Sequence, residues 1–198
     1  MKTKPYHHGD LRTMMIEKGI EFIDEHGAKD LSLRKIAAAC GVSHSAPYSH
    51  FASKEELLSA IEKHITGKFA AALKDSVKET GITIEGLINL SCAYVMFFVR
   101  KPEYYRFIFS HSSGIEAGDG HEYEPYDFFK DFMRKLLETT DYPKEIWVKI
   151  FYAHWAMMHG LASIGILFDE EEIHVIEKYV REILSNNYLI IKQEGYYA

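Results

Sequence analysis

The sequence predicts an all-α protein, in which an N-terminal domain of three helices precedes a larger helical bundle. Apolar residues recur at spacings of three and four through most of the chain, which is the period of an amphipathic helix. No alternating run rich in Val or Thr and bounded by turn residues occurs, and the chain has only 5 prolines. With 47% hydrophobic residues over 198 positions, the chain can bury a substantial core.

The stretch from Leu31 to Phe51 predicts two short helices joined by a tight turn. Ser32 can cap the first helix, and Gly41 follows at the point where a left-handed turn would end it. Ser43 can cap a second helix, which Phe51 closes. Two helices joined by a short turn that contains Gly form a helix-turn-helix, whose second helix can enter the major groove of DNA.

Four runs of residues around this motif carry a resemblance to a known family. Glu-His-Gly stands at 25–27, Leu-Ser-Leu-Arg-Lys-Ile-Ala and Ala-Cys-Gly-Val-Ser stand within 31–43, and Tyr-Ser-His-Phe-Ala-Ser-Lys-Glu-Glu-Leu-Leu stands at 48–58. Together they resemble the TetR family of bacterial transcriptional repressors. The resemblance implies that 6–65 is a helix-turn-helix DNA-binding domain and that 66–198 is a helical domain for ligand binding and dimerisation.

The second helix of the motif, expected over 44–50, supplies the candidate DNA contacts. Its small side chains allow a close approach to base edges, and by likeness to the family Tyr48 and His50 anchor the DNA backbone. Lys54 contacts phosphate in the family, although an exposed first-turn lysine is the alternative interpretation. Pro47 replaces the branched apolar residue of most relatives, and it suits a first helical turn. The predicted DNA-binding residues are Arg34, Ser43, His44, Ser45, Ala46, Tyr48, Ser49, His50 and Lys54.

Further helices are expected on either side of this motif. Asp10 can cap a helix that runs to His26, and a capping box at 53–56 begins a long helix that links the two domains and ends before Gly81. The next helix is apolar on nearly all sides, so it belongs at the centre of a bundle. The helices of the second domain are expected over 84–100, from Pro102 to about Phe109, and over 125–139, 144–168 and 170–193.

The last two helices carry more apolar residues than a single bundle of this size must bury. We expect them to pair with the same helices of a second copy, which gives a homodimer. A dimer also suits a two-fold operator. Trp155, His159 and Gly160 resemble the Trp-His-Gly signature of one TetR subgroup, and residues 6–12 resemble the opening of that subgroup.

The middle of the chain is unusually aromatic, which favours a small-molecule site. Aromatic and Met residues with a few polar groups line pockets between helices, although they also fill ordinary cores. His154, His159 and the Tyr hydroxyls would need polar partners if buried, and a ligand or water could supply them. The predicted ligand-binding residues are Tyr94, Phe98, Tyr104, Tyr105, Phe128, Phe132, His154, Trp155, Met158 and His159.

Charge and cysteine usage restrict the possible partners. Residues 1–64 carry nine Lys and Arg against nine Asp and Glu, so the net charge of −6 arises in the rest of the chain, and phosphate contacts must be few and local. Cys40 and Cys92 show neither disulfide nor metal spacing. The loop at 110–124 holds His and acidic residues but matches no calcium or zinc pattern, so a mobile lid or a solvated loop is the alternative to a metal site there. The first eight residues form a basic arm that can reach DNA or remain a solvated tail.

These observations predict a transcriptional repressor that a small apolar or aromatic ligand releases from double-stranded operator DNA. We expect a cytoplasmic homodimer without cofactor or metal, and no membrane contact, because no run of about 18 apolar residues occurs. The chain lacks a phosphate loop, a nucleophile motif and a His-Glu zinc motif, so an enzyme is not expected. The alternative is a helical adaptor that uses the helix-turn-helix for protein contacts.

Overall fold

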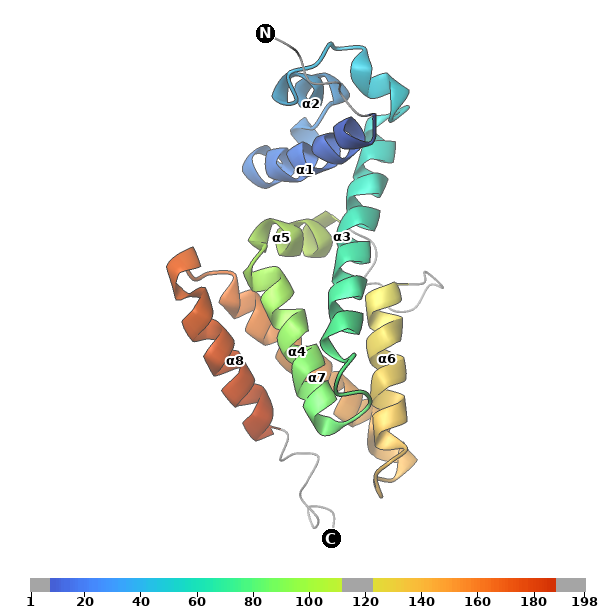
Figure 1. The fold of residues 1–198 in the computed structure, drawn as a ribbon, viewed down its shortest axis with the longest axis vertical. Helices are drawn as coiled ribbons and strands as arrows, with labels where there is room; N and C mark the ends of the chain where they lie inside the picture. Colours follow the sequence, from blue (N-terminus) through green and yellow to red (C-terminus); the bar gives the residue numbers. More distant parts are fainter. Residues whose placement is uncertain (1–7, 112–122, 188–198) are drawn as a thin grey trace. The chain divides into compact units, whose positions relative to one another are not determined.

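The structure is a computed structural model that describes residues 8–111 and 123–187. All regular secondary structure in these two ranges is helical, which confirms the predicted all-α class (Figure 1). No helix within them is both long and apolar enough to cross a membrane. Among the same residues, no three His, Cys, Asp or Glu side chains are grouped so that they could hold a metal ion.

The described chain divides into two compact units. The first comprises His8–Thr66 and Arg106–His111, and the second comprises Gly67–Tyr105 and 123–187. The expected domains, 6–65 and 66–198, differ from these units in the segment from Arg106 onward. The Arg106 guanidinium explains why this segment joins the first unit, because it makes a bidentate ion pair with the Asp24 carboxylate (Nη2 to Oδ2, 2.8 Å). The division into two functional domains stays a prediction.

The first unit holds the predicted helix-turn-helix. Its elements are α1 (His8–His26), the 3-10 turn η1 (Ala28–Asp30), α2 (Leu33–Ala39), the 3-10 turn η2 (Ala46–Ser49) and the first part of α3 (Lys54–Ser76). Met15, Ile36, Leu57 and Ile61 are fully buried and form the centre of its core. The expectation that Asp10 caps the first helix is wrong, because α1 already begins at His8.

Local side-chain chemistry sets the ends of these helices much as predicted. The Ser32 hydroxyl accepts a hydrogen bond from a backbone N–H in the first turn of α2. Gly41 follows the end of that helix and has a positive φ of 67°. At the start of α3, the Ser53 hydroxyl accepts the Glu56 N–H (3.3 Å). The Glu56 carboxylate reaches back to the N–H of Ala52 (2.6 Å), one residue earlier than the usual capping box.

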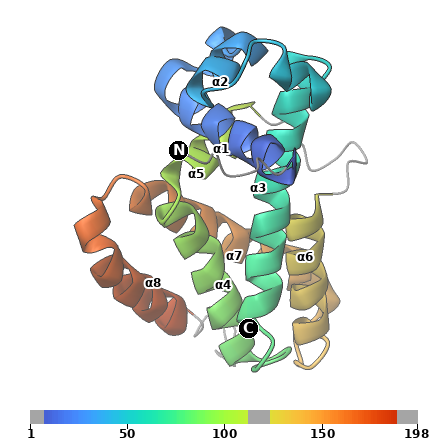
Figure 2. The ribbon, with the colours of Figure 1, turned by 45° about the horizontal axis from the view of Figure 1, so that its top comes forward.

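The second unit is a helical bundle built around α4, as the apolar character of that helix predicted. Its elements are the rest of α3, α4 (Ile84–Val99), the start of α5 (Pro102–His111), α6 (Glu124–Leu137), α7 (Lys144–Gly165), the short turn η4 (Glu170–Glu172) and α8 (Ile173–Asn187). Most residues of α4 are buried, and α4 packs against both α7 and α8. In Figures 1 and 2, α4 lies between α8 on one side and α3 on the other.

Several predicted features fall wholly or partly outside the described residues. Helix α5 extends to His111, and 112–122 of the predicted loop lie outside the described residues. The same holds for the basic arm except His8, for the start of the subgroup-like opening, and for the end of the terminal helix beyond Asn187. These expectations stay predictions.

Candidate nucleic-acid interface and ligand site

The candidate recognition segment is a single 3-10 turn, so the expectation of a helix over 44–50 is wrong. Only Ala46–Ser49 are helical. In an α-helix the N–H of residue 47 would donate to the Ser43 carbonyl, but Pro47 has no N–H. The Ala46 N–H donates to that carbonyl instead (3.0 Å), and the Tyr48 N–H donates to the Ser45 carbonyl (3.2 Å), so the segment begins at the tighter 3-10 spacing.

The predicted cap at Ser43 is also wrong. Its hydroxyl lies 3.2 Å from the hydroxyl of Ser45 rather than on a backbone N–H. Ser45 precedes the 3-10 turn and makes no side-chain cap either. The two hydroxyls therefore form a small polar pair at the start of the segment.

The segment turns its polar residues outward and its apolar residues inward. Pro47 is buried and Phe51 is only 1% exposed, with the Arg12 guanidinium 5.0 Å from the centre of the Phe51 ring. Tyr48, by contrast, is 55% exposed. The other predicted contacts here are the exposed Ser43, His44, Ser45 and Ser49 and the half-buried Ala46 and His50. Hydroxyl, imidazole and phenol groups are thus presented along one short stretch of surface.

The two predicted cations of this surface have different surroundings. Arg34 is exposed on α2. Lys54 is half-buried, and its ammonium donates to the Lys29 carbonyl (3.0 Å) in the turn before α2. Lys35 holds the neighbouring carbonyl of Asp30 in the same way (2.8 Å). Because a lysine ammonium has three donors, Lys54 can keep this bond and still meet a phosphate oxygen.

Most of the predicted ligand-binding residues gather in one aromatic cluster of the second unit. The Tyr94 ring lies 5.6 Å from the rings of both Phe98 and Trp155, and 5.3 Å from that of His159. Tyr94, Phe98, Phe132 and Met158 are buried, and His154, Trp155 and His159 are half-buried. Phe129, an aromatic residue of the same region that is not among the ten predicted ligand-binding residues, also belongs to the cluster, because its ring packs against that of Trp155 (5.3 Å).

The two histidines of this cluster have partners within the protein. The Ser91 hydroxyl donates to a backbone carbonyl, so His154 Nε2 carries the proton and donates to Ser91 (2.7 Å). Burial lowers the pKa of His154 to about 4. His159 Nδ1 donates to the Trp155 carbonyl (3.2 Å), and the Tyr94 hydroxyl donates to Nε2 (3.1 Å). Both histidines and the Tyr94 hydroxyl therefore have hydrogen-bond partners without a ligand.

The other predicted ligand residues lie at the edge of this cluster or outside it. Tyr104 is buried, and its hydroxyl accepts a hydrogen bond from the Lys68 ammonium (3.2 Å). The half-buried Tyr105 packs edge-on against Phe98 (5.4 Å). Phe128 is half-buried on α6. The assignment of these residues to ligand binding stays a prediction.

Three grooves of the second unit are lined only by described residues, and none of the ten predicted ligand residues lines them. The largest of the three has a volume of about 710 Å³ and lies between α3, α4 and α8. A second, of about 290 Å³, lies between α6 and α7. The third, of about 250 Å³, lies between α7 and α8 and is mainly apolar.

The apolar groove continues into exposed apolar side chains of the last two helices. Ile164 is 58% exposed on α7, and Leu167 and Phe168 follow directly after that helix. On α8, Tyr179 and Ile183 are also exposed. We call these five residues the α7–α8 apolar surface. Contiguous apolar surface of this kind is typical of an interface between proteins.

Part of the first unit is similar in sequence to regulatory proteins. Residues 15–61 match the family described as "Bacterial regulatory proteins, tetR family". An uncharacterized HTH-type transcriptional regulator of Mycobacterium tuberculosis is 31% identical over 116 residues, which cover 56% of this chain and 47% of the relative. The chain therefore spans less than half of the length of this relative.

Solved structures share the fold over nearly the whole chain. A protein of unknown function from Rhodococcus sp. RHA1 is 24% identical with a TM-score of 0.68, over 93% of this chain and 98% of that one. AibR, solved in complex with isovaleryl coenzyme A and operator DNA, is 17% identical with a TM-score of 0.63, over 87% of this chain and 97% of that one. Likeness at this level of identity establishes a common fold.

Proposed function

We propose that this chain, whose residues 15–61 match the N-terminal domain of the tetR family of bacterial regulatory proteins, is a homodimeric transcriptional repressor. The first unit binds double-stranded operator DNA, and a small apolar or aromatic ligand bound to the second unit releases it. One observation carries the DNA-binding role. Most of the polar side chains around η2 are exposed, while Pro47 and Phe51 are buried.

The relatives support a regulator rather than an enzyme. The matched part of the chain resembles a protein named as a transcriptional regulator. AibR has this fold and was solved with both an acyl-coenzyme A and operator DNA, so a protein of this architecture can hold a small molecule and DNA together. A repressor of bacterial genes would work in the cytoplasm, where the DNA lies.

Each predicted DNA contact has a chemical role. The hydroxyls of Ser43, Ser45 and Ser49 can donate to or accept from base edges, and Ala46 can touch a thymine methyl group. His44 is exposed beside them. The remaining residues position the protein on phosphate, and they are Tyr48, His50, Arg34 and Lys54. Because the first 64 residues carry balanced charge, we expect few phosphate contacts.

A second copy completes the DNA-binding form. We assign the α7–α8 apolar surface to the dimer interface, since burying it removes exposed apolar side chains from water. Two recognition segments related by a two-fold axis can then read two half-sites about one helical turn apart.

The ligand predicted from the sequence would enter the aromatic cluster around Tyr94. Trp155 and His159 of the subgroup-like signature lie in that cluster, and Gly160 follows on α7. This favours a regulator of the Trp-His-Gly subgroup. A ligand there would have to displace ring contacts or the Tyr94–His159 hydrogen bond.

The experiment that tests DNA binding starts from genomic fragments that the purified protein retains. Fluorescence anisotropy then measures the affinity for a retained fragment at increasing salt. We expect Tyr48→Ala to weaken binding about tenfold and Lys54→Gln to reduce the salt slope by about one. Lys35→Gln is the matched control, because Lys35 also holds a carbonyl of the η1 turn without being a predicted DNA contact.

The adaptor alternative makes the opposite prediction. Contacts with DNA phosphates weaken steeply as salt rises, whereas an apolar protein contact does not. If the protein retains no genomic fragment, or if retention is indifferent to salt and to changes at His44, Tyr48 and Lys54, the repressor proposal is wrong.

A further inference from the structure

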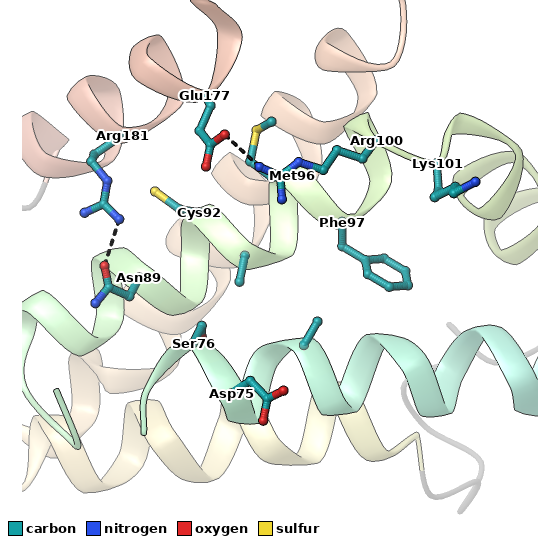
Figure 3. A pocket seen from close by; sticks show the side chains of 12 residues that line it. Asp75, Ser76, Asn89, Cys92, Met96, Phe97, Arg100, Lys101, Glu177 and Arg181 are labelled. Carbon is teal, nitrogen blue, oxygen red and sulfur yellow. Dashed lines mark hydrogen bonds and ion pairs between the residues drawn. The ribbon is translucent and has the colours of Figure 1, made fainter. Parts of the chain in front are cut away.

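The largest of the three grooves, which we call the α3–α4–α8 groove, holds none of the residues predicted for ligand binding (Figure 3). Its volume of about 710 Å³ lies in the range typical of small-molecule sites. Every residue that lines it belongs to the second unit. The groove can therefore be described without reference to the first unit.

The floor of the groove is apolar. Cys92 and Met96 of α4 are buried, and Ala93, Phe97 and Ala72 beside them are half-buried. Burial raises the pKa of the Cys92 thiol to about 11, so it carries no charge at neutral pH. An apolar molecule resting on this floor would meet no unpaired charge there.

The rim of the groove carries three cations. Arg100 and Lys101 stand at the end of α4, and Arg181 stands on α8. Arg100 Nη2 lies 2.7 Å from a carboxylate oxygen of Glu177, and Arg181 Nη2 donates to the Asn89 side chain (2.8 Å), as the dashed lines in Figure 3 mark. Exposed ion pairs of this kind are weak, so an incoming anion can replace Glu177 at little cost in free energy.

The order of these residues along α4 suggests an elongated ligand. Polar Asn89, apolar Cys92 and Met96, and cationic Arg100 follow one another at helical spacing. From Asn89 to Arg100 the helix rises about 16 Å. The opposite wall includes one acidic residue, Asp75 of α3, which disfavours an anionic head on that side.

We propose that the α3–α4–α8 groove binds an amphipathic anion, with a carboxylate or phosphate head on Arg100 and Lys101 and an apolar body over Met96 and Cys92. This gives the repressor an effector site in the groove, in addition to the aromatic cluster around Tyr94, and it rests on the proposed function for that role. Sequence reasoning missed the site because it treated α4 as apolar on nearly all sides.

The walls of the groove connect such a ligand to both regions that a repressor needs. One wall is the end of α3, whose first residue is Lys54 of the predicted DNA surface. The other wall is α8, which also carries Tyr179 and Ile183 of the α7–α8 apolar surface. A ligand that binds better when α8 and α3 are further apart would shift the population toward that conformer. Operator affinity then falls if that conformer separates the two recognition segments.

Calorimetric titration of the full chain without DNA tests binding. The probes are dodecanoate and dodecyl phosphate below micelle formation, and dodecylamine has the same chain with the opposite charge. We expect both anions to bind saturably and dodecylamine not to. Arg100→Gln should weaken binding about tenfold, since it removes a charge-assisted bond. Ala93→Phe should weaken it by filling the floor.

Arg134→Gln is the matched control, because Arg134 also pairs with carboxylates on an exposed surface, but on α6. It should bind the anions as the wild type does. The proposal is overturned if neither anion binds, if dodecylamine binds equally well, or if Arg100→Gln and Ala93→Phe both retain full affinity. Arg100 is exposed, so its replacement leaves the fold intact even if Ala93→Phe does not.

A separate titration of the operator complex keeps the two proposals apart. The anions should release the wild-type protein from a retained fragment and release Arg100→Gln less readily. Anions that bind but leave the operator complex intact would overturn the effector role while leaving DNA binding in place. A protein that retains no DNA at all would overturn the proposed function, and the calorimetric result on the groove would still stand.

Discussion

A single proline decides the form of the recognition segment. Pro47 lacks the N–H that an α-helix needs at its position, so the segment begins with bonds at the shorter 3-10 spacing. The buried ring still fills the space beneath the segment. The exposed hydroxyls before it, on Ser43 and Ser45, therefore lie in an irregular turn rather than on a helix.

A buried histidine makes stability depend on pH. Burial lowers the pKa of His154 to about 4 from an ordinary value of 6.5. Between these values the unfolded chain binds a proton that the folded chain does not, so the free energy of unfolding falls as the pH drops through this window, by up to about 3 kcal/mol. His154→Gln should flatten this dependence in urea unfolding measured at pH 7, 6 and 5.

The exposed His174 of α8 provides the control for this measurement. His174→Gln should leave the dependence of unfolding on pH as it is in the wild type. An unchanged pH profile in His154→Gln would mean that the ring is not held neutral by the fold.

At the scale of elements, close helix packing depends on a glycine of α7. A Cβ built on Gly165 would lie 2.4 Å from Cγ2 of Val99 on α4, whose branched side chain has little room to move. Gly160, also on α7, has no atom within 4 Å of such a Cβ. Alanine at position 160 would therefore change only the helix propensity of α7, whereas alanine at position 165 would also change its packing against α4.

Replacing each glycine with alanine should change stability in opposite directions. Gly165→Ala should lower the free energy of unfolding by about 1–3 kcal/mol, because it overpacks the contact between α4 and α7. Gly160→Ala should raise it by up to about 1 kcal/mol, since alanine favours the helix. The urea midpoints of the two variants check this. Equal shifts would show that α7 and α4 do not pack this closely.

At the scale of the whole molecule, most of the exposed large apolar side chains of the described residues lie on the last two helices or directly after α7. The α7–α8 apolar surface joins a groove whose lining is mainly apolar, so water covers it only at a cost in free energy. The α3–α4–α8 groove, by contrast, has a charged rim, which suits a small charged ligand better than a second protein.

A charge placed in the apolar surface should prevent dimerisation. Ile164→Glu would bury a carboxylate without a partner, so we expect it to weaken the dimer roughly tenfold or more. Sedimentation velocity over a range of concentrations measures this. Ile82→Glu is the matched control, because Ile82 is also exposed (41%, against 58% for Ile164) but lies in the turn before α4. A dimer that survives Ile164→Glu would exclude this surface.

Much of the fold could be predicted from the sequence, because the responsible interactions are local. The capping hydroxyls of Ser32 and Ser53 act on backbone groups three residues ahead. The glycine at position 41 adopts positive φ where the helix must end. The apolar residues on nearly all sides of α4 likewise predicted its central place in the bundle.

Only the tertiary structure decided which distant groups satisfy one another. His154 and His159 of α7 form hydrogen bonds with Ser91 and Tyr94 of α4. The two imidazoles that suggested a ligand therefore already have partners within the protein. Arg100 meets Glu177 across the α3–α4–α8 groove for the same reason. Periodicity places a residue on a face of its own helix, but the partner of that face depends on how the helices pack, which no local pattern encodes.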